Sequence, residues 1–194
     1  MPKYEYGKIA KLSESLKKAN IDQKIIEQII EGGEAIRAST APEKKAEWLK
    51  GAMLRIDKLL DKDTRQVVRE ACACCLGGKR LKLSKAIAKQ NKTLTDRIKA
   101  ANETKLVFGH SVTMENDGRI LVCFAPEGLP KYNCSCLGRK VKESLPITYC
   151  YCCGGHVKHH LQIALGSQLV CEVRSSALSS EGKEPCTFLF SIKE

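Results

Sequence analysis

The sequence is poor in aromatic residues and has no long apolar run. Aromatic side chains make up 5% of the 194 residues, with a single tryptophan, whereas proteins that bind single-stranded nucleic acid usually stack bases on such rings. No apolar run approaches the roughly 20 residues of a membrane span, and the N-terminal residues lack the apolar core of a signal peptide. These absences predict a soluble, cytoplasmic protein with no membrane partner.

Complete catalytic signatures are also absent. The chain contains no Gly-x-Ser-x-Gly elbow, no Walker loop and no dinucleotide-binding glycine fingerprint. The sequence therefore leaves open whether the protein is an enzyme, and any chemistry has to come from residues outside these motifs.

Basic residues exceed acidic ones, mainly in the first half of the chain. The formal net charge is +11, and residues 1–103 hold 23 lysines and arginines against 14 acidic residues. A basic region can meet nucleic acid, an anionic ligand or an acidic partner. Because the lysines are dispersed among glutamates, we favour an ordinary solvated helix surface and expect no nucleic-acid partner.

Periodicity predicts an α+β protein, with a helical N-terminal region over residues 1–103 and an antiparallel sheet domain over residues 104–194. In the first region apolar residues recur at helical spacing, and one predicted helix runs from Asp63 to Leu76. In the second, Asn116-Asp117-Gly118 lies between alternating segments and predicts a hairpin. The two regions can also form one compact unit.

The hairpin is followed by segments that complete the predicted sheet domain. We expect a short strand at 147–152, then a helix opened by Gly154-Gly155 and ended by Gly166, and finally two strands at 169–176 and 186–192. Because this helix carries an apolar stripe, we predict that it is the one main helix packed on the sheet.

Eleven cysteines are the most unusual feature of the composition. Disulfides are disfavoured in a reducing compartment, and an odd number of cysteines cannot be fully paired. Clustered cysteines in such a protein more often indicate metal binding or thiol chemistry. The cysteine clusters are therefore the candidate functional sites.

Residues 149–160, YCYCCGGHVKHH, contain three cysteines and three of the four histidines. The spacing C-x2-C-x2-H-x3-H, from Cys150 to His160, resembles that of zinc ligands. On the predicted helix, Cys153, His156 and His160 fall along one side. The start of a helix favours thiolates, because its free N–H groups and dipole lower thiol pKa values. Cys136, on the preceding loop, is the nearest candidate for a further ligand.

Two other features complete the set of candidates. In the group Cys72-Ala-Cys74-Cys75, helical spacing places Cys72 and Cys75 inward, either as core residues or as ligands that meet the C-terminal cysteines. Glu172 lies in an otherwise apolar strand, as a ligand or on a solvated face. The candidate ligand-binding residues are Cys150, Cys153, His156 and Glu172, and the candidate metal ligands are Cys72, Cys75, Cys136, Cys150, Cys153 and His160.

The C-terminal half, roughly residues 105–194, resembles the vinyl-reductase-type small-molecule-binding domain and its uncharacterised bacterial and archaeal relatives. The shared outline is a cysteine-bearing segment, a helix ending in glycine, a strand with an acidic residue, a Ser/Gly turn and a closing strand; here these are Cys150–Cys153, Gly154–Gly166, Val170–Ser176, Ser179–Lys183 and Cys186–Ile192. The resemblance implies an α+β ligand-binding fold, associated in some relatives with zinc or an apolar ligand. Cys152 and the 72–75 group exceed that pattern.

Two functional hypotheses follow. The first is a cytoplasmic binding or sensor protein that holds a small molecule or a zinc ion at the cysteine cluster. The alternative is a cysteine-dependent hydrolase or oxidoreductase, with Cys150 or Cys153 as the reactive thiolate and His156 or His160 as the base. The expected partner is a small-molecule ligand, and a homodimer is an allowed assembly.

Overall fold

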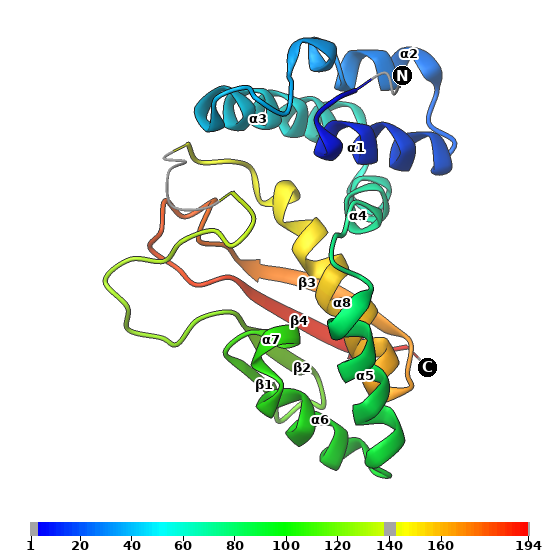
Figure 1. Ribbon diagram of the computed structural model, residues 1–194, viewed down its shortest axis with the longest axis vertical. Helices are drawn as coiled ribbons and strands as arrows, with labels where there is room; N and C mark the ends of the chain where they lie inside the picture. Colours follow the sequence, from blue (N-terminus) through cyan, green and yellow to red (C-terminus); the bar gives the residue numbers. More distant parts are fainter. Residues whose placement is uncertain (1–3, 138–142, 194) are drawn as a thin grey trace.

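The computed structural model describes residues 4–137 and 143–193 of the chain. Within these residues, the part before the sheet is built from helices joined by short connections (Figure 1). These are α1 (Gly7–Lys18), α2 (Gln23–Ile29), the 3-10 turn η1 (Gly33–Ala35), α3 (Pro42–Leu59), α4 (Lys62–Ala71), α5 (Gly78–Gln90), α6 (Leu94–Glu103) and α7 (Lys105–Phe108).

Four antiparallel strands form the sheet, in the order β1-β2-β4-β3. Their bounds are β1 (Ser111–Met114), β2 (Ile120–Cys123), β3 (Leu169–Ser175) and β4 (Thr187–Ile192). Between β2 and β3 the chain forms the 3-10 turn η2 (Ile147–Cys150) and the helix α8 (Tyr151–Leu165). Helix α8 packs on the sheet, so the predicted α+β class with a main helix on an antiparallel sheet is confirmed.

The predicted hairpin is confirmed as the pair β1–β2. Met114 lies opposite Ile120, and the turn between them holds Gly118 at φ +79°, a conformation that costs glycine little. The Asp117 side chain accepts a hydrogen bond from the backbone N–H of Arg119. The turn chemistry therefore fixes the register of the strands.

The predicted strand over residues 147–152 is wrong, because this segment forms η2 and the first turn of α8. Its Ile-Thr-Tyr composition favours strands, but β propensity yields to tertiary packing. Tyr149 and Cys150 are adjacent and are 1% and 4% exposed. A strand would direct them to opposite faces, whereas the helical turn buries both against the N-terminal helices.

Gly154 and Gly155 lie inside α8 rather than opening it, and they let the helix approach its neighbours closely. A Cβ atom on Gly155 would lie 2.4 Å from the Glu70 carbonyl oxygen, and one on Gly154 would lie 2.8 Å from Cys171 Sγ. The two glycines thus allow α8 to contact α4 on one side and β3 on the other. The predicted end of the helix at Gly166 is confirmed, with this residue at φ +73°.

Helix α4 ends at Ala71, five residues before the predicted end, and a loop leads from there to α5. This loop changes the direction of the cysteines that follow. Cys72 remains buried, but Cys75 has φ +60° and is exposed, so the prediction that it points inward is wrong. The helical spacing on which the prediction depended does not apply beyond Ala71.

Two clusters of buried side chains form the cores of the molecule. The first lies among α1–α4 and takes Tyr149 and Cys150 from η2. The second lies between the sheet and helices α5, α6 and α8. Helix α8 begins beside the first cluster and runs into the second (Figure 1). The division of the chain into domains at residue 103 stays a prediction.

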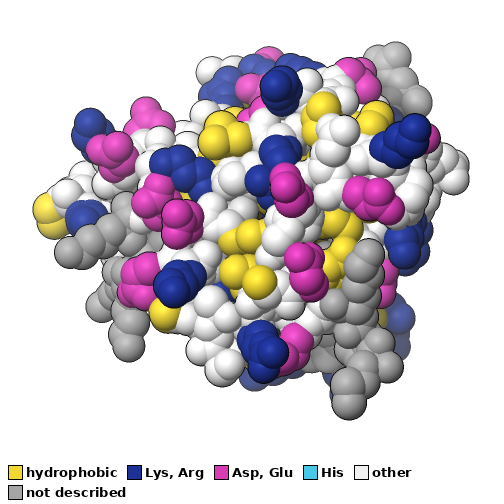
Figure 2. Space-filling model, turned by 90° about the horizontal axis from the view of Figure 1, so that it is seen from above, with side chains coloured by type: hydrophobic (Ala, Val, Ile, Leu, Met, Phe, Trp, Pro, Cys, Tyr) yellow, Lys and Arg dark blue, Asp and Glu magenta, His cyan; other side chains and the backbone are white. Residues whose placement is uncertain are grey.

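The surface over the N-terminal helices carries charges of both signs. Lys and Arg side chains are interspersed with Asp and Glu on this face (Figure 2). The basic excess of the chain is therefore not gathered into one patch there. Among the described residues, no helix is both long enough and apolar enough to cross a membrane.

Candidate metal centre

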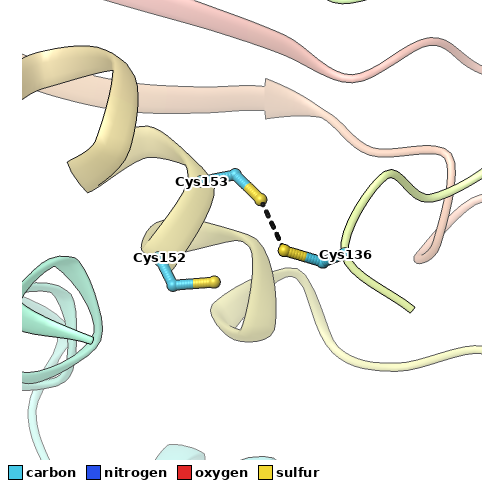
Figure 3. Close-up of side chains that lie close together, drawn as sticks. All are labelled: Cys136, Cys152 and Cys153. Carbon is cyan, nitrogen blue, oxygen red and sulfur yellow. Dashed lines mark hydrogen bonds between the residues drawn. The ribbon is translucent and has the colours of Figure 1, made fainter. Parts of the chain in front are cut away.

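Three cysteine sulfurs converge where α8 begins. Cys136 comes from the loop after β2, and Cys152 and Cys153 belong to the first turn of α8 (Figure 3). The Sγ atoms of Cys136 and Cys153 are 3.4 Å apart, and all three Sγ atoms lie within 4.8 Å of one another. We call these residues the thiol triad.

The helical start explains how two neighbouring residues reach the same site. Consecutive helical residues are separated by about 100°, so Cys152 and Cys153 both project to one side of the first turn and meet Cys136 between them (Figure 3). The 3-10 turn η2 leads directly into α8, and the Tyr151 N–H donates to the Thr148 carbonyl. The helix dipole, whose positive end lies at this turn, favours negative charge on the sulfurs.

The spacing of the sulfurs suits a tetrahedral metal ion. With zinc–sulfur bonds of about 2.3 Å, two thiolate ligands in a tetrahedron are about 3.8 Å apart. The Cys136–Cys153 separation of 3.4 Å and the upper limit of 4.8 Å for all three sulfurs bracket that value. Small side-chain movements would therefore bring the triad into zinc-binding geometry.

The triad favours one thiolate, at Cys152. Its pKa is held well below the ordinary thiol value, chiefly because the Cys136 and Cys153 thiols donate hydrogen bonds to its sulfur. The positive charges of Arg69 and Lys8 act in the same direction, and burial opposes them. Cys152 is thus the first member of the triad to lose its proton.

The other two thiols hold their protons more firmly. The hydrogen bond to Cys152 raises the pKa of Cys136 to about 12, and hydrogen bonds with both neighbours raise the pKa of Cys153 well above its ordinary value. Of the three thiols, Cys152 is therefore the one that most readily carries a negative charge. A bound cation would displace the remaining protons, so metal binding here would release protons.

The triad separates two cavities. One, the α1 cavity, has a volume of about 370 Å³ and is lined by residues that include Lys8, Lys11 and Arg69. The other, the α7 cavity, has a volume of about 250 Å³ and is lined by residues that include Arg80 and Lys105. Cys74, Cys136 and Cys152 line both cavities. Cys136 and Cys152 are thus accessible to small molecules from two sides, and Cys153 from one.

Cys150, a predicted ligand, lies outside the triad. Its Sγ atom is 2.8 Å from the Ser176 hydroxyl, and burial raises its pKa. Cys72 is also buried, and its thiol donates a hydrogen bond to the Val68 carbonyl. Burial raises the pKa of Cys72 as well, despite the opposing charge of Arg69.

The 72–75 group reaches the triad only through the cavities. Cys72 lines the α1 cavity with Cys152, and Cys75 lines the α7 cavity with Cys153. Neither joins the set of ligand atoms within 4.8 Å of one another. Cys72 and Cys75 thus line the same cavities as the triad without joining its ligand atoms.

The two predicted histidine ligands bond to other groups. His156 Nδ1 is 2.8 Å from the Cys74 carbonyl oxygen, and burial lowers the pKa of this histidine. His160 is fully buried, with Nδ1 3.0 Å from the Ser84 hydroxyl and Nε2 3.1 Å from the Cys75 carbonyl. Burial lowers the pKa of His160 to about 4, so its ring is neutral and ties α8 to α5 and the preceding loop.

Glu172 lies on β3, away from the triad. Along β3, Cys171 is buried on the face that packs against α8, while Glu172 is exposed. Strand alternation therefore directs the Glu172 side chain to the other face of the sheet. Glu172 is thus exposed on the face of the sheet away from α8, and its role as a ligand stays a prediction.

Sequence reasoning missed Cys152, which was interpreted as surplus to the cysteine pattern. If residues 147–152 formed a strand, Cys152 would share a face with Cys150; in the helix it instead lies beside Cys153. The adjacent cysteines before Gly154-Gly155 were the available signal. Arg69 and Lys8 carried no signal, because each comes from a distant helix.

Comparison with known proteins identifies one family. A model described as a family of unknown function, DUF6144, matches residues 4–190. No curated protein and no solved structure matches the chain. These results neither support nor contradict the resemblance of the C-terminal half to the vinyl-reductase-type domain. Because the match spans nearly the whole chain, the protein belongs to the DUF6144 family.

Proposed function

We propose that this protein binds a zinc ion through Cys136, Cys152 and Cys153 and senses or binds a small molecule beside it. The observation that carries the proposal is the convergence of three sulfurs within 4.8 Å of one another. Thiolates select soft metals such as zinc, copper(I) or the iron of iron–sulfur clusters. We choose zinc because protein zinc sites are tetrahedral and often contain three or four cysteine thiolates.

A three-cysteine site leaves a fourth coordination position. Structural zinc sites fill this position with a protein ligand, whereas sites that bind other molecules keep it open. Cys136 and Cys152 line two cavities, which supports an open position that a small molecule can occupy. Cys74, which lines the same cavities, is the candidate to close the site when no ligand is bound.

The surrounding charges support an anionic metal centre. Three thiolates and one Zn²⁺ have a net charge of about −1, and charges taken from water require compensation. Arg69 and Lys8 act on the Cys152 sulfur with the required sign. Such outer partners commonly tune metal affinity about 10- to 100-fold.

Metal analysis tests this proposal. Protein purified without chelators or a metal-affinity step should contain about one zinc per chain, and Cys152→Ser should lose it. The matched control is Cys123→Ser, a buried cysteine on β2 outside the triad. Wild-type protein without metal that also takes up none on addition of zinc would contradict the proposal, and so would equal zinc in the two variants.

A reactive-thiol function is the second candidate, favoured by the lowered pKa of Cys152 beside two cavities. The reactive residue would then be Cys152 rather than Cys150 or Cys153. Iodoacetamide should label Cys152 in metal-free protein much faster than the other ten cysteines. Equal rates for all exposed cysteines would exclude this alternative.

The compartment, the partners and the assembly of the protein are part of the same proposal. We propose that it acts in the cytoplasm, where a reducing environment keeps thiols available as ligands. A small-molecule ligand is the proposed partner, without nucleic acid, and a homodimer remains a proposed assembly. Gel filtration with light scattering distinguishes a monomer from a dimer.

A further inference from the structure

Arg69 is a buried cation with no carboxylate partner in the part of the chain that the structure describes. Its side chain is 4% exposed and donates hydrogen bonds to the backbone carbonyls of Thr148 and Tyr149, at 3.4 and 3.0 Å. Each described ion pair involves a different lysine or arginine. The carbonyl groups accept hydrogen bonds but carry no formal charge, so thiolate at the triad is the compensating charge that the described residues offer to Arg69. A buried charge without a partner is costly.

Two lysines share the α1 cavity with Arg69. Lys8 donates to the Cys136 carbonyl at 3.1 Å and to the Tyr149 hydroxyl at 2.7 Å, and Lys11 donates to the Ala73 carbonyl at 2.6 Å. All of these partners are neutral, and no Asp or Glu is among the described residues that line the cavity. Three positive charges therefore surround a space that contains no formal negative charge of its own, apart from thiolate at the triad.

Two partly buried cations near the cavity do have acidic partners. Lys158 pairs with Glu70 at 2.6 Å, and Arg65 pairs with Asp57 at 3.1 Å. These pairs lie on the same helix system, α3, α4 and α8, that borders the cavity. Arg55 and Arg97 also donate only to backbone carbonyls. Among the described lysines and arginines, Arg69 is distinguished by its depth, because it alone is buried.

The rest of the cavity lining suits an apolar body. Leu49, Tyr6 and Tyr149 contribute to the wall. The volume of about 370 Å³ is at the small end of ligand pockets, which span roughly 300–1,000 Å³. Cys136 and Cys152 form another part of the wall, so a bound molecule would lie against the triad.

We infer that the α1 cavity binds a small organic anion, a carboxylate or a phosphate monoester, through Lys8, Lys11 and Arg69. The apolar body of the ligand lies against Leu49 and the tyrosines, and its position beside Cys152 brings it to the open side of the metal centre. This inference names the ligand class for the small-molecule part of the proposed function. The cationic cavity itself does not depend on a bound metal.

Calorimetric titration with matched probes tests the inference. Benzoate and phenyl phosphate supply the two anionic groups on one apolar body, and benzamide is the neutral match for benzoate. At least one anion should bind in the micromolar to millimolar range, and benzamide at least about tenfold more weakly than benzoate. The ratio between benzoate and phenyl phosphate affinity identifies the preferred anion.

Variants of α1 connect the binding to the cavity. Lys11→Met should weaken the tighter anion about tenfold, whereas Lys18→Met, an exposed lysine at the end of the same helix, should leave its affinity unchanged. Lys11 is exposed, so this substitution keeps the fold where Arg69→Met would risk it. Circular dichroism and thermal unfolding verify that both variants are folded.

Three outcomes would overturn the inference: no binding of either anion at millimolar concentration, benzamide binding as tightly as benzoate, or equal affinities for Lys11→Met and Lys18→Met. Repeating the anion titration with Cys152→Ser shows whether anion binding needs the metal ligands, and zinc analysis judges the metal proposal separately. If zinc is absent from wild type but anion binding depends on Lys11, the anion site stands and the metal proposal fails. If zinc is present and no anion binds, the reverse holds.

Discussion

Two sets of cysteines in this protein have different surroundings. Cys136, Cys152 and Cys153 converge between two cavities, whereas Cys150 and Cys171 are enclosed at 4% and 3% exposure. The members of the first set share hydrogen bonds between sulfurs, and one of them has a lowered pKa. Burial raises the pKa of both members of the second set. Surroundings, more than sequence spacing, thus separate candidate ligands from core residues.

The difference arises within a few residues of chain. Cys150 ends η2 and faces the first core, while Cys152 begins the next turn and faces the cavities. Two helical steps of about 100° each turn the side chain from core to site. A single short segment thereby contributes to both stability and proposed function.

The largest expected effect comes from a change that disturbs both sets together. Gly155→Ala would place a Cβ atom 2.4 Å from the Glu70 carbonyl oxygen, in contact with backbone that cannot move freely. We expect a loss of about 3 kcal/mol or more in the free energy of unfolding, measured by urea denaturation.

Gly51→Ala is the matched control, because its new Cβ would meet only the flexible end of Arg55, at 3.2 Å. Inside helix α3, this substitution should stabilise the protein by up to about 1 kcal/mol. Similar destabilisation by both substitutions would contradict the close contact between α8 and α4.

A pair of serine substitutions separates the two sets of cysteines. Cys171→Ser puts a hydroxyl into the apolar contact between β3 and α8 and should lower the free energy of unfolding by about 1–3 kcal/mol while leaving zinc content unchanged. Cys136→Ser should do the opposite, losing zinc with a smaller change in the stability of metal-free protein. The two measurements are metal content and urea denaturation. Loss of zinc in Cys171→Ser with zinc retained in Cys136→Ser would contradict the division of the cysteines into ligands and core residues.

The pH dependence of stability tests the role of His160. Its pKa is about 4 in the folded protein, below the ordinary value of 6.5, so the unfolded chain binds a proton first as pH falls. Stability from this residue is complete above pH 6.5 and is lost as pH falls towards 4, by at most about 2 kcal/mol near pH 5. Denaturation of His160→Gln at about pH 7 and pH 5 should show a smaller difference than wild type.

His110→Gln, which removes an exposed histidine side chain, is the control for that experiment. It should keep the wild-type difference in unfolding free energy between the two pH values. If His160→Gln also keeps the full wild-type difference, His160 is not the source of the pH dependence.

The smallest effect is expected on the sheet surface. Glu172→Gln changes an exposed side chain and should alter the free energy of unfolding by no more than about 0.5 kcal/mol. Zinc content and anion affinity should also be unchanged. Loss of zinc or of anion affinity in this variant would show that Glu172 contributes to the site.

The sequence predicted the parts of the fold that local chemistry determines. The Asn116-Asp117-Gly118 turn identified the β1–β2 hairpin, and Gly166 identified the end of α8, because each needs a specific backbone conformation. The segment at 147–152 was mistaken for a strand, since its burial depends on helices more than 70 residues away in sequence. That contact cannot be read from local propensity.

The candidate site was predicted only in part, again because some of its contacts come from distant parts of the chain. Cys136 and Cys153 were expected to contribute ligands, and the structure brings them together. Cys152 was left out of the candidate ligands because it exceeds the cysteine pattern of the domain that the C-terminal half resembles. His160 follows a ligand spacing, yet its partners come from α5 and the preceding loop, which the spacing of α8 alone does not reveal.

Cobalt titration of metal-free protein tests the three-cysteine metal centre most directly. Co²⁺ can occupy tetrahedral zinc sites, and thiolate ligands give it strong sulfur-to-cobalt charge-transfer absorption in the near ultraviolet. We predict saturation at about one Co²⁺ per chain with this absorption, its loss in Cys152→Ser, and its retention in Cys123→Ser. Saturation without the charge-transfer absorption, or the same absorption in a variant with serine at positions 136, 152 and 153, would contradict the account.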